Sequence, residues 1–320
     1  MSLLNIKELK AAAARSLDAA TYSPKKLALI HGGITAIAML IVSLLDLLLS
    51  RQIGTTGGLS GMGTRAILST VQSALSLGIS IALPFWEMGM LYACLQFARK
   101  ENAGLPSLAE GFRRFFPLLR LMLLETAIYF IGMIVAANVS SIIFMMTPLS
   151  NSFAAALESI SVDELTVEAM MPLLSATIPL YLIMAVVALI LLIPITYRFR
   201  IAGFYLLSGS RRALVAMGVS NRIMNGNRLA FFKLELSFWW YYGCTFLLSA
   251  IASLNIILDL PDWSSYILYF VYLAGHVLLS WQATAYVQTT YAHAYEVLIS
   301  AETEKPMVRN FPWGFLPDQE

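Results

Sequence analysis

The sequence predicts an all-α membrane protein, a polytopic bundle of six transmembrane helices with amphipathic helices on the cytosolic side. Composition is the first reason: of 320 residues, 58% are hydrophobic and 12% are charged, and the mean hydropathy is +0.73. Soluble domains carry about 25% charged residues, and a soluble chain this apolar would expose large apolar patches. Six long apolar runs and an uneven distribution of Lys and Arg are the other two reasons.

Each apolar run exceeds the roughly 20 residues that a helix needs to cross the hydrocarbon core. None shows the period-2 alternation of a membrane strand, and lipid offers no partners for open backbone groups, so helices remain. The predicted spans are residues 27–49, 66–98, 117–147, 173–207, 229–258 and 266–298. The chain therefore divides into an N-terminal tail (1–26), a transmembrane domain (27–298) and a C-terminal tail (299–320).

The basic residues predict the orientation of the spans. Eighteen of the 21 Lys and Arg residues lie in the two tails and in the second and fourth connections, against two, Arg51 and Arg65, in the first connection. The remaining one, Arg120, lies inside a span. Under the positive-inside rule both termini are cytosolic. The sequence thus predicts a multi-pass protein of the plasma membrane.

The tails and connections carry further predictions. The N-terminal tail is expected to hold an amphipathic helix, and the first span is expected to be retained as an anchor, because it lacks the features of a cleaved signal. Residues 54–63 are glycine-rich and are expected to form a flexible loop. Ser161 to Glu164 matches a capping box, which predicts a short helix. The aromatic segment 311–317 is expected to dock on the cytosolic face, with a partner-binding motif as the alternative.

A basic, amphipathic segment precedes the fifth span. Drawn as a helix, it places Leu214, Met217 and Met224 on one face and its arginines on another. Such a segment is typical of helices at the membrane surface, where basic side chains meet anionic headgroups; simple anchoring is the alternative. The candidate contacts to lipid headgroups are Arg211, Arg212, Arg222, Arg228 and Lys233.

Three two-span units can be traced along the chain. The second unit enters the membrane through Phe115-Phe116 and the third through Phe231-Phe232, 116 residues later. The N-terminal tail and first span would be a degenerate first copy. Units with an even number of spans are parallel repeats, related by an axis along the membrane normal. The alternative is that such aromatic and basic entries recur only as interface anchors.

The segment after the basic helix also carries a family resemblance. Its pattern is Ser220-x3-Met224-x-Gly226, then Phe231-Phe232-x-Leu234-x-Leu236-Ser237-Phe238-x-Trp240. It resembles a bacterial family of six-span integral membrane proteins of unknown function, distantly similar to the membrane domain of glycerophosphodiester phosphodiesterases. ELKAAAARSL and AYVQTTYAHAYEVL are similar too, so the resemblance covers most of the chain, which departs from it at Ala285-Tyr286, where members often have Pro-Tyr. The resemblance implies no activity, ligand or catalytic residue.

Ionisable residues inside spans are the main functional candidates, because a charge at the bilayer centre costs at least about 2.5–3.5 kcal/mol. Glu87 and Glu125 are the best placed to be held inside the bundle, with Arg120, Arg198 and Arg200 as partners. Paired structural charges are one interpretation, and a proton or substrate relay is the other. The candidate intramembrane polar site is Glu87, Glu125, Gln282, Tyr286, His293 and Glu296.

The second span carries a stripe of serines on the same helical line as Glu87. Small residues and hydroxyls favour close helix packing, whereas a wet conduit leading to Glu87 is the alternative. Pro84 is expected to kink this helix beside Glu87. The serines of the stripe are Ser69, Ser73, Ser76 and Ser80.

The leading function hypothesis is a non-enzymatic membrane protein that organises the bilayer or supports a partner complex. The alternative is a transporter or channel for a small solute or lipid that uses the intramembrane carboxylates. No nucleophile elbow is present, so we predict no catalytic residue, and the three histidines predict no metal site. No cofactor is expected. The expected partners are membrane lipids, anionic at the cytosolic face, and a protein partner, but no nucleic acid, because topology explains the basic residues.

Overall fold

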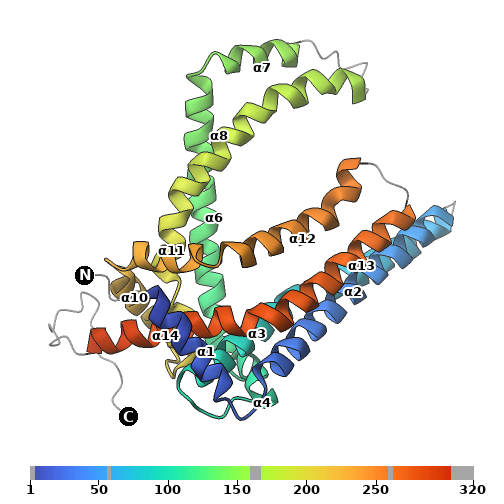
Figure 1. Cartoon of the computed structure of the whole chain (residues 1–320). Helices are drawn as coiled ribbons and strands as arrows, with labels where there is room; N and C mark the ends of the chain where they lie inside the picture. The colour runs from blue at the N-terminus through green and yellow to red at the C-terminus, as the bar shows by residue number, and fades with distance from the viewer. Residues whose placement is uncertain (1–3, 56–58, 159–166, 259–261, 304–320) are drawn as a thin grey trace.

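The computed structural model describes residues 4–55, 59–158, 167–258 and 262–303, and every regular element in them is a helix (Figure 1). The long helices are α2 (Pro24–Thr55), α3 (Leu59–Ala98), α6 (Phe115–Met145), α8 (Val167–Phe199), α12 (Trp239–Leu258), α13 (Asp262–Leu279) and α14 (Ala285–Thr303). The shorter helices are α1 (Ile6–Asp18), α4 (Leu105–Leu108), α5 (Glu110–Arg113), α7 (Leu149–Glu158), α9 (Ala202–Leu207), α10 (Ala213–Met224), α11 (Arg228–Leu236) and the π-helical η1 (Ser280–Thr284).

The helices form two limbs that diverge from a common base (Figure 1). One limb is the hairpin of α6 and α8, with α7 at its far end; the other limb combines α2, α3, α12 and α13. The base gathers α1, α9, α10 and α11 against α14. Since α6 and α8 pack mainly on each other, the first limb joins the rest of the molecule through the base.

Five helices in the described residues are long and apolar enough to cross a membrane, which makes the chain a membrane protein. They are Pro24–Leu45, Ser69–Ala98, Phe115–Met145, Ser175–Leu207 and Tyr266–Thr303. Each coincides with one of the predicted spans. The remaining predicted span, 229–258, is two helices rather than one, because α11 ends at Leu236 and α12 begins at Trp239.

The break between α11 and α12 has a local cause. The Ser237 hydroxyl donates to the carbonyl of Leu234 at 2.6 Å, a side-chain bond that competes with helix continuation. The Ser237 carbonyl accepts a hydrogen bond from Lys10 of α1 at 3.0 Å. The same ammonium group lies 4.2 Å from the centre of the Phe238 ring, and its partial burial lowers the pKa of Lys10. Helix α1 therefore docks at the point where the apolar run is divided.

Two other predicted spans are also interrupted. The run 173–207 divides into α8 and α9 near Arg200, and the run 266–298 contains η1. At η1 the Ser280 hydroxyl donates to the carbonyl of Ala28 in α2 at 3.0 Å. A Cβ atom on Gly32 of α2 would lie only 2.6 Å from the Ser280 Cβ. The π-helical turn thus lies where α2 packs tightly against Ser280.

The connections differ from the predictions at one place. Helix α2 continues to Thr55 and α3 begins at Leu59, so most of the glycine-rich segment 54–63 is helical rather than a loop. The reason is that glycine only weakens a helix, by about 1 kcal/mol per residue, which the flanking apolar helices overcome. The helix predicted from Ser161 and the aromatic segment 311–317 lie outside the described residues.

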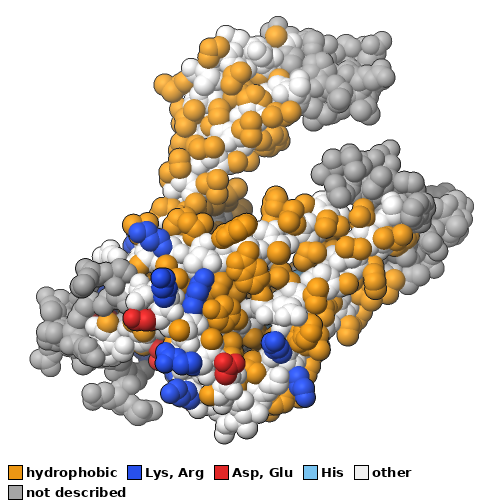
Figure 2. Space-filling model, in the orientation of Figure 1, with side chains coloured by type: hydrophobic (Ala, Val, Ile, Leu, Met, Phe, Trp, Pro, Cys, Tyr) orange, Lys and Arg blue, Asp and Glu red, His pale blue; other side chains and the backbone are white. Residues whose placement is uncertain are grey.

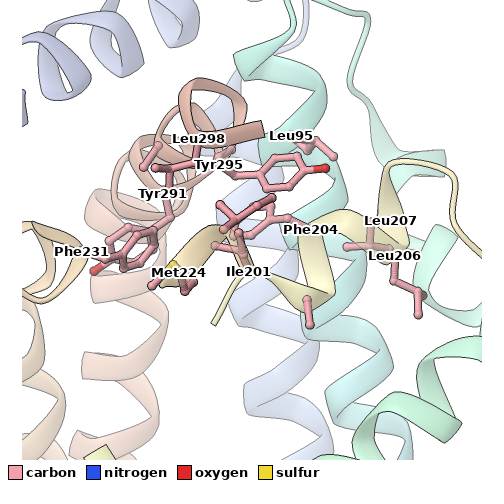
Figure 3. Packing of buried hydrophobic residues seen from close by; sticks show 14 of the residues in the cluster. Leu95, Ile201, Phe204, Leu206, Leu207, Met224, Phe231, Tyr291, Tyr295 and Leu298 are labelled. Atoms are coloured by element: carbon pink, nitrogen blue, oxygen red, sulfur yellow. The ribbon is translucent and has the colours of Figure 1, made fainter. Parts of the chain in front are cut away.

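The largest buried core lies at the base, not along the limbs (Figure 3). There Phe204 stacks on Tyr295 with ring centres 5.5 Å apart, and Phe231 lies 5.7 Å from Tyr291. On the limb of α6 and α8, by contrast, Phe130 and Ile190 are each 66% exposed. A protein whose limbs are solvated by lipid tails has no need to bury such side chains.

Two glycines fix α4 and α5 against the part of α3 that is nearest the base. A Cβ atom on Gly89 would lie 1.9 Å from the carbonyl oxygen of Leu108, and one on Gly111 would lie 1.9 Å from the carbonyl oxygen of Phe85. Both obstacles are backbone atoms, which cannot rotate away as a side chain can. Only glycine allows the two backbones to approach this closely.

We predict that Gly89→Ala destabilises the protein, because the added methyl group meets the backbone of α4; overpacking of this kind costs about 1–3 kcal/mol or more. The measurement is the melting temperature of the purified protein in detergent. The matched control is Gly78→Ala in the same helix, where no atom of the described residues lies within 4 Å of the added Cβ. Equal melting temperatures for the two variants would contradict the predicted contact.

Candidate functional site

A cavity of about 240 Å³ lies where the two limbs meet the base, and we call it the proximal cavity. Its walls come from α3, α6, α8, α9, α11 and α14, so both limbs contribute to it. The lining residues that carry charge are Glu87, Glu125 and Arg200. Aromatic rings supply much of the remaining wall, namely those of Tyr129, Phe199, Phe204, Phe231 and Tyr291.

The proximal cavity brings together Glu87 of α3 and Glu125 of α6, two of the predicted site residues. The Glu87 side chain is 52% exposed, so its carboxyl group faces open space although it lies within a span. Neither carboxyl group makes an ion pair with a Lys or Arg of the described residues. Unpaired carboxyl groups at this depth are costly unless water, a proton or a ligand compensates them.

Of the three arginines considered as partners for these carboxylates, Arg200 is the one that lines the cavity. Its Nε atom, however, lies 2.6 Å from Oε1 of Glu235 in α11. The Tyr197 hydroxyl donates to the other oxygen of Glu235. Glu235 thus holds Arg200 at the junction of α8 and α11, and the positive charge of Arg200 is balanced outside the cavity.

A second hollow, of about 500 Å³ and open along one side, lies farther along α2, α3 and α13, and we call it the distal cavity. Ser80, the last residue of the predicted serine stripe, lines it together with Pro84 and His276. Ser69 and Ser73 instead donate to carbonyl groups of their own helix. Glu87 and its neighbour Met88 line both cavities, so the two cavities meet at Glu87.

His31 of α2 lies beside this junction. Its ring is 2% exposed, its Nε2 atom is 3.5 Å from the Glu87 carboxyl group, and neither ring nitrogen makes a hydrogen bond to any residue that the structure describes. Its ring stacks on that of Trp86 with centres 5.7 Å apart, and the Trp86 Nε1–H donates to the His31 carbonyl at 3.1 Å. His31 lies within the predicted span 27–49, but its place beside Glu87 follows only from the packing of α2 on α3.

The predicted site residues of the last helix lie away from the proximal cavity. Gln282 is exposed, and Tyr286 meets Phe238 edge-on. His293 hydrogen-bonds to Ser16 of α1 at 2.9 Å, and Glu296 pairs with Arg99 of α3 at 2.8 Å. His293 and Glu296 thus lie where α14 packs on α1 and α3, whereas Gln282 belongs to η1 and Tyr286 contacts the junction of α11 and α12.

Two residues of α14 that the sequence did not single out line the cavity instead, Gln288 and Tyr291. They are spaced i, i+3 on the neighbouring face. The Tyr291 hydroxyl lies 2.7 Å from that of Tyr242, and the guanidinium group of Arg200 lies 5.8 Å from the centre of the Tyr291 ring. The i, i+3 spacing of Gln288 and Tyr291 is the sequence pattern that could have indicated them. Two residues make a weaker pattern than the larger set of polar residues predicted in the same helix.

The candidate headgroup contacts lie on the base. Arg211 and Arg212 are exposed just before α10, Arg222 pairs with Glu302 at 2.8 Å, and Arg228 and Lys233 belong to α11. The apolar face that the sequence assigns to this segment is largely buried within the protein. Met217 is 6% and Met224 0% exposed, whereas Leu214 is 68% exposed. Helix α10 is therefore held mainly by the base core rather than by a membrane surface.

A bundle of long apolar helices with a carboxylate-lined cavity defines a multi-pass helical membrane protein. A family model described as "Protein of unknown function (DUF975)" matches residues 25–302, and the chain belongs to this family. No curated protein and no solved structure matches the chain.

We predict that Arg200→Met lowers the melting temperature in detergent, because Glu235, 15% exposed, loses its cation. Loss of a hydrogen bond to a charged group costs about 1.5–3 kcal/mol. The control is Arg113→Gln, since Arg113 is 69% exposed in its pair with Glu110 and exposed pairs contribute about 0–1 kcal/mol. The double variant Arg200→Met/Glu235→Leu should recover part of the loss. An effect of Arg200→Met no larger than that of the control would argue against the pair.

Proposed function

We propose that this protein is a six-span transporter or channel of the bacterial plasma membrane that passes a small solute or lipid headgroup. The observation that carries the proposal is the meeting of the proximal and distal cavities at Glu87. Together the cavities provide space on both sides of one intramembrane carboxyl group. A protein that only organised lipid around itself would have no need of this arrangement.

The proposed orientation places the base in the cytosol, together with both termini. Figure 2 supports it, because on the face shown the Lys and Arg side chains gather at the base while hydrophobic side chains cover both limbs. Charged side chains at the base meet water and headgroups, and the limbs meet hydrocarbon. We assign α12 (Trp239–Leu258) as the sixth span, since its 20 residues match the bilayer and it runs beside α13.

The number of spans decides the side of the C-terminus. With a cytosolic N-terminus, six spans return the chain to the cytosol, whereas five leave the end of α14 outside. We therefore expect green fluorescent protein fused after Thr303 to fluoresce and alkaline phosphatase at the same point to be inactive. The control is the same pair of fusions between α12 and α13, where the expected activities are reversed. Active phosphatase after Thr303 would rule out six spans.

We also propose that the spans form three parallel units. The pairs α2 and α3, α6 and α8, and α12 and α13 are each an antiparallel hairpin. In the second and third units the first phenylalanine of the entry pair faces inward. Phe115 stacks on Phe85, and Phe231 packs near Tyr291, while Phe116 and Phe232 are 70% and 40% exposed. Matching roles at matching positions favour a repeat over coincidental anchors.

The proposed activity is non-enzymatic, and the proximal cavity presents carboxyl groups and rings rather than a nucleophile with an adjacent base.

Bacterial origin and a distant relation to the membrane domain of glycerophosphodiester phosphodiesterases rest on the sequence motif and are proposed on that ground. A second candidate function is support of the bilayer or of a protein partner. The Lys and Arg side chains on the base favour this second function, because a positively charged surface attracts anionic lipid. Anionic lipid that co-purifies with the protein would be the observation that supports it.

Accessibility of cysteines to a membrane-impermeant maleimide tests the transport proposal. The background is Cys94→Ala/Cys244→Ser, because the chain contains these two cysteines. Thr196→Cys probes the proximal cavity and Ser80→Cys the distal cavity. We expect rapid labelling of Thr196→Cys from the cytosolic side and of Ser80→Cys from the outer side. Water in the cavities lets the reagent enter and allows the thiol to ionise to the reactive thiolate.

Leu77→Cys is the matched control, since Leu77 lies in the same helix as Ser80 and is 62% exposed along the limb. In lipid its thiol should stay protonated and unlabelled. Should both cavity cysteines be as inert as this control, the cavities are dry and the transport proposal fails. Support of the bilayer or of a partner would then be the better proposal.

A further inference from the structure

The proximal cavity has an excess of negative charge. In the described part of the chain, its lining carries the carboxyl groups of Glu87 and Glu125 and the guanidinium group of Arg200, and the Glu235 carboxyl group pairs with Arg200 beside it. Three negative charges against one positive charge leave two uncompensated when all the carboxyl groups are ionised. Since Arg200 is already held by Glu235 at 2.6 Å, the two uncompensated charges fall on Glu87 and Glu125, the groups that face the open space.

Among the described residues, Arg200 is the one Lys or Arg that lines the proximal cavity, and it forms its ion pair with Glu235 rather than with Glu87 or Glu125. Glu87 has His31 at 3.5 Å, but the His31 ring makes no hydrogen bond to a described residue and is stacked on Trp86. The remaining charged residue of the lining, Arg200, is the one whose charge Glu235 balances. A ligand with a positive charge would therefore restore the balance, whereas an anion would meet two carboxyl groups and a guanidinium group that is already paired.

The aromatic lining of the cavity indicates which kind of cation it would bind. Five aromatic side chains line the cavity, and the faces of such rings attract cations within about 6 Å. The cavity already contains one example, the guanidinium group of Arg200 at 5.8 Å from the centre of the Tyr291 ring. A bare metal ion prefers a close shell of oxygen ligands, which rings do not provide. Carboxyl groups together with rings are instead typical of sites for organic ammonium groups.

The dimensions fit a headgroup-sized ligand. The volume of about 240 Å³ is below the roughly 300–1,000 Å³ of pockets for drug-sized ligands. The walls belong to both limbs, and the hollow between the limbs is bordered by hydrophobic side chains (Figure 2). An ammonium group could arrive as a free solute, or as the headgroup of a lipid whose tails lie between the limbs.

We propose that the proximal cavity binds an organic ammonium group, held by the carboxylates of Glu87 and Glu125 and by the surrounding aromatic rings. This inference rests on the proposed function and specifies the class of its substrate. Glu125 acts as a direct counter-ion from α6, and Glu87 acts as the counter-ion at the point where the distal cavity begins. The aromatic rings exclude water and stabilise the cation through their faces.

Binding of choline tests the charge requirement without any variant. The full-length protein in a maltoside detergent is titrated with choline or with 3,3-dimethylbutan-1-ol, a neutral molecule of the same shape, and tryptophan fluorescence follows thermal unfolding. We expect saturable stabilisation by choline and at least tenfold weaker stabilisation by the alcohol. Equal effects of the two molecules would overturn the inference, as would stabilisation by inorganic phosphate but not by choline.

Single variants then assign the counter-ions. Glu125→Gln and Glu87→Gln are each expected to weaken choline binding by about tenfold or more, because each removes one carboxylate. The control is Glu302→Gln, whose carboxyl group pairs with Arg222 on the base and lies outside the cavity lining; its binding should equal that of the unsubstituted chain. Unchanged choline affinity in both cavity variants would overturn the assignment.

Two lipids separate the sources of the ammonium group. Competition by dilauroylphosphatidylethanolamine, but not by dilauroylphosphatidylglycerol with the same tails, identifies a lipid headgroup; choline binding that neither lipid displaces identifies a free solute. Both outcomes support an ammonium site, whereas stronger competition by the anionic phosphatidylglycerol opposes it. The cysteine labelling described above tests the transport proposal independently of choline. If both cavity cysteines are labelled but choline does not bind, the ammonium inference is wrong and the transport proposal still stands.

Discussion

Close contacts between helix backbones at Gly89 and Gly111 fix how α3, α4 and α5 pack beside the proximal cavity. Lipid tails are as apolar as leucine, so helices in a membrane gain little by burying apolar side chains and must gain from close packing instead. Here the carbonyl oxygens of Leu108 and Phe85 occupy the space where a Cβ atom would be. These contacts hold α4 and α5 against α3 on either side of Glu87, and so they fix the depth and direction of that carboxyl group.

Close packing is also found where the last helix meets α2. Because Gly32 has no side chain, the Ser280 side chain fits against α2 at this point, and the π-helical turn η1 widens the last helix there. Beyond these contacts the limbs diverge, because α6 and α8 find partners mainly in each other. Tight packing near the base and free helices beyond it leave the charged cavity at the point where the limbs separate.

Arg200 lines the proximal cavity but does not form an ion pair with its carboxyl groups. Arg200, Glu235 and Tyr197 form a bonded group at the junction of α8 and α11. Because the positive charge is occupied there, Glu87 and Glu125 remain available to the cavity. A direct pairing of Arg200 with either of them would have filled the site with an internal ion pair. Under the proposed function, this arrangement leaves the carboxyl groups of Glu87 and Glu125 available to a ligand.

Sequence patterns were enough to predict a multi-pass membrane protein and to single out Glu87 and Glu125, which line the proximal cavity. Apolar runs locate spans because lipid imposes a minimum helix length, and Glu87 and Glu125 stood out because charges within spans are costly. The tertiary structure alone decided that Glu235, not Glu87 or Glu125, pairs with Arg200. It also decided which face of the last helix lines the cavity. Periodicity shows which residues share a face, but which neighbour that face meets depends on contacts between helices far apart in the chain.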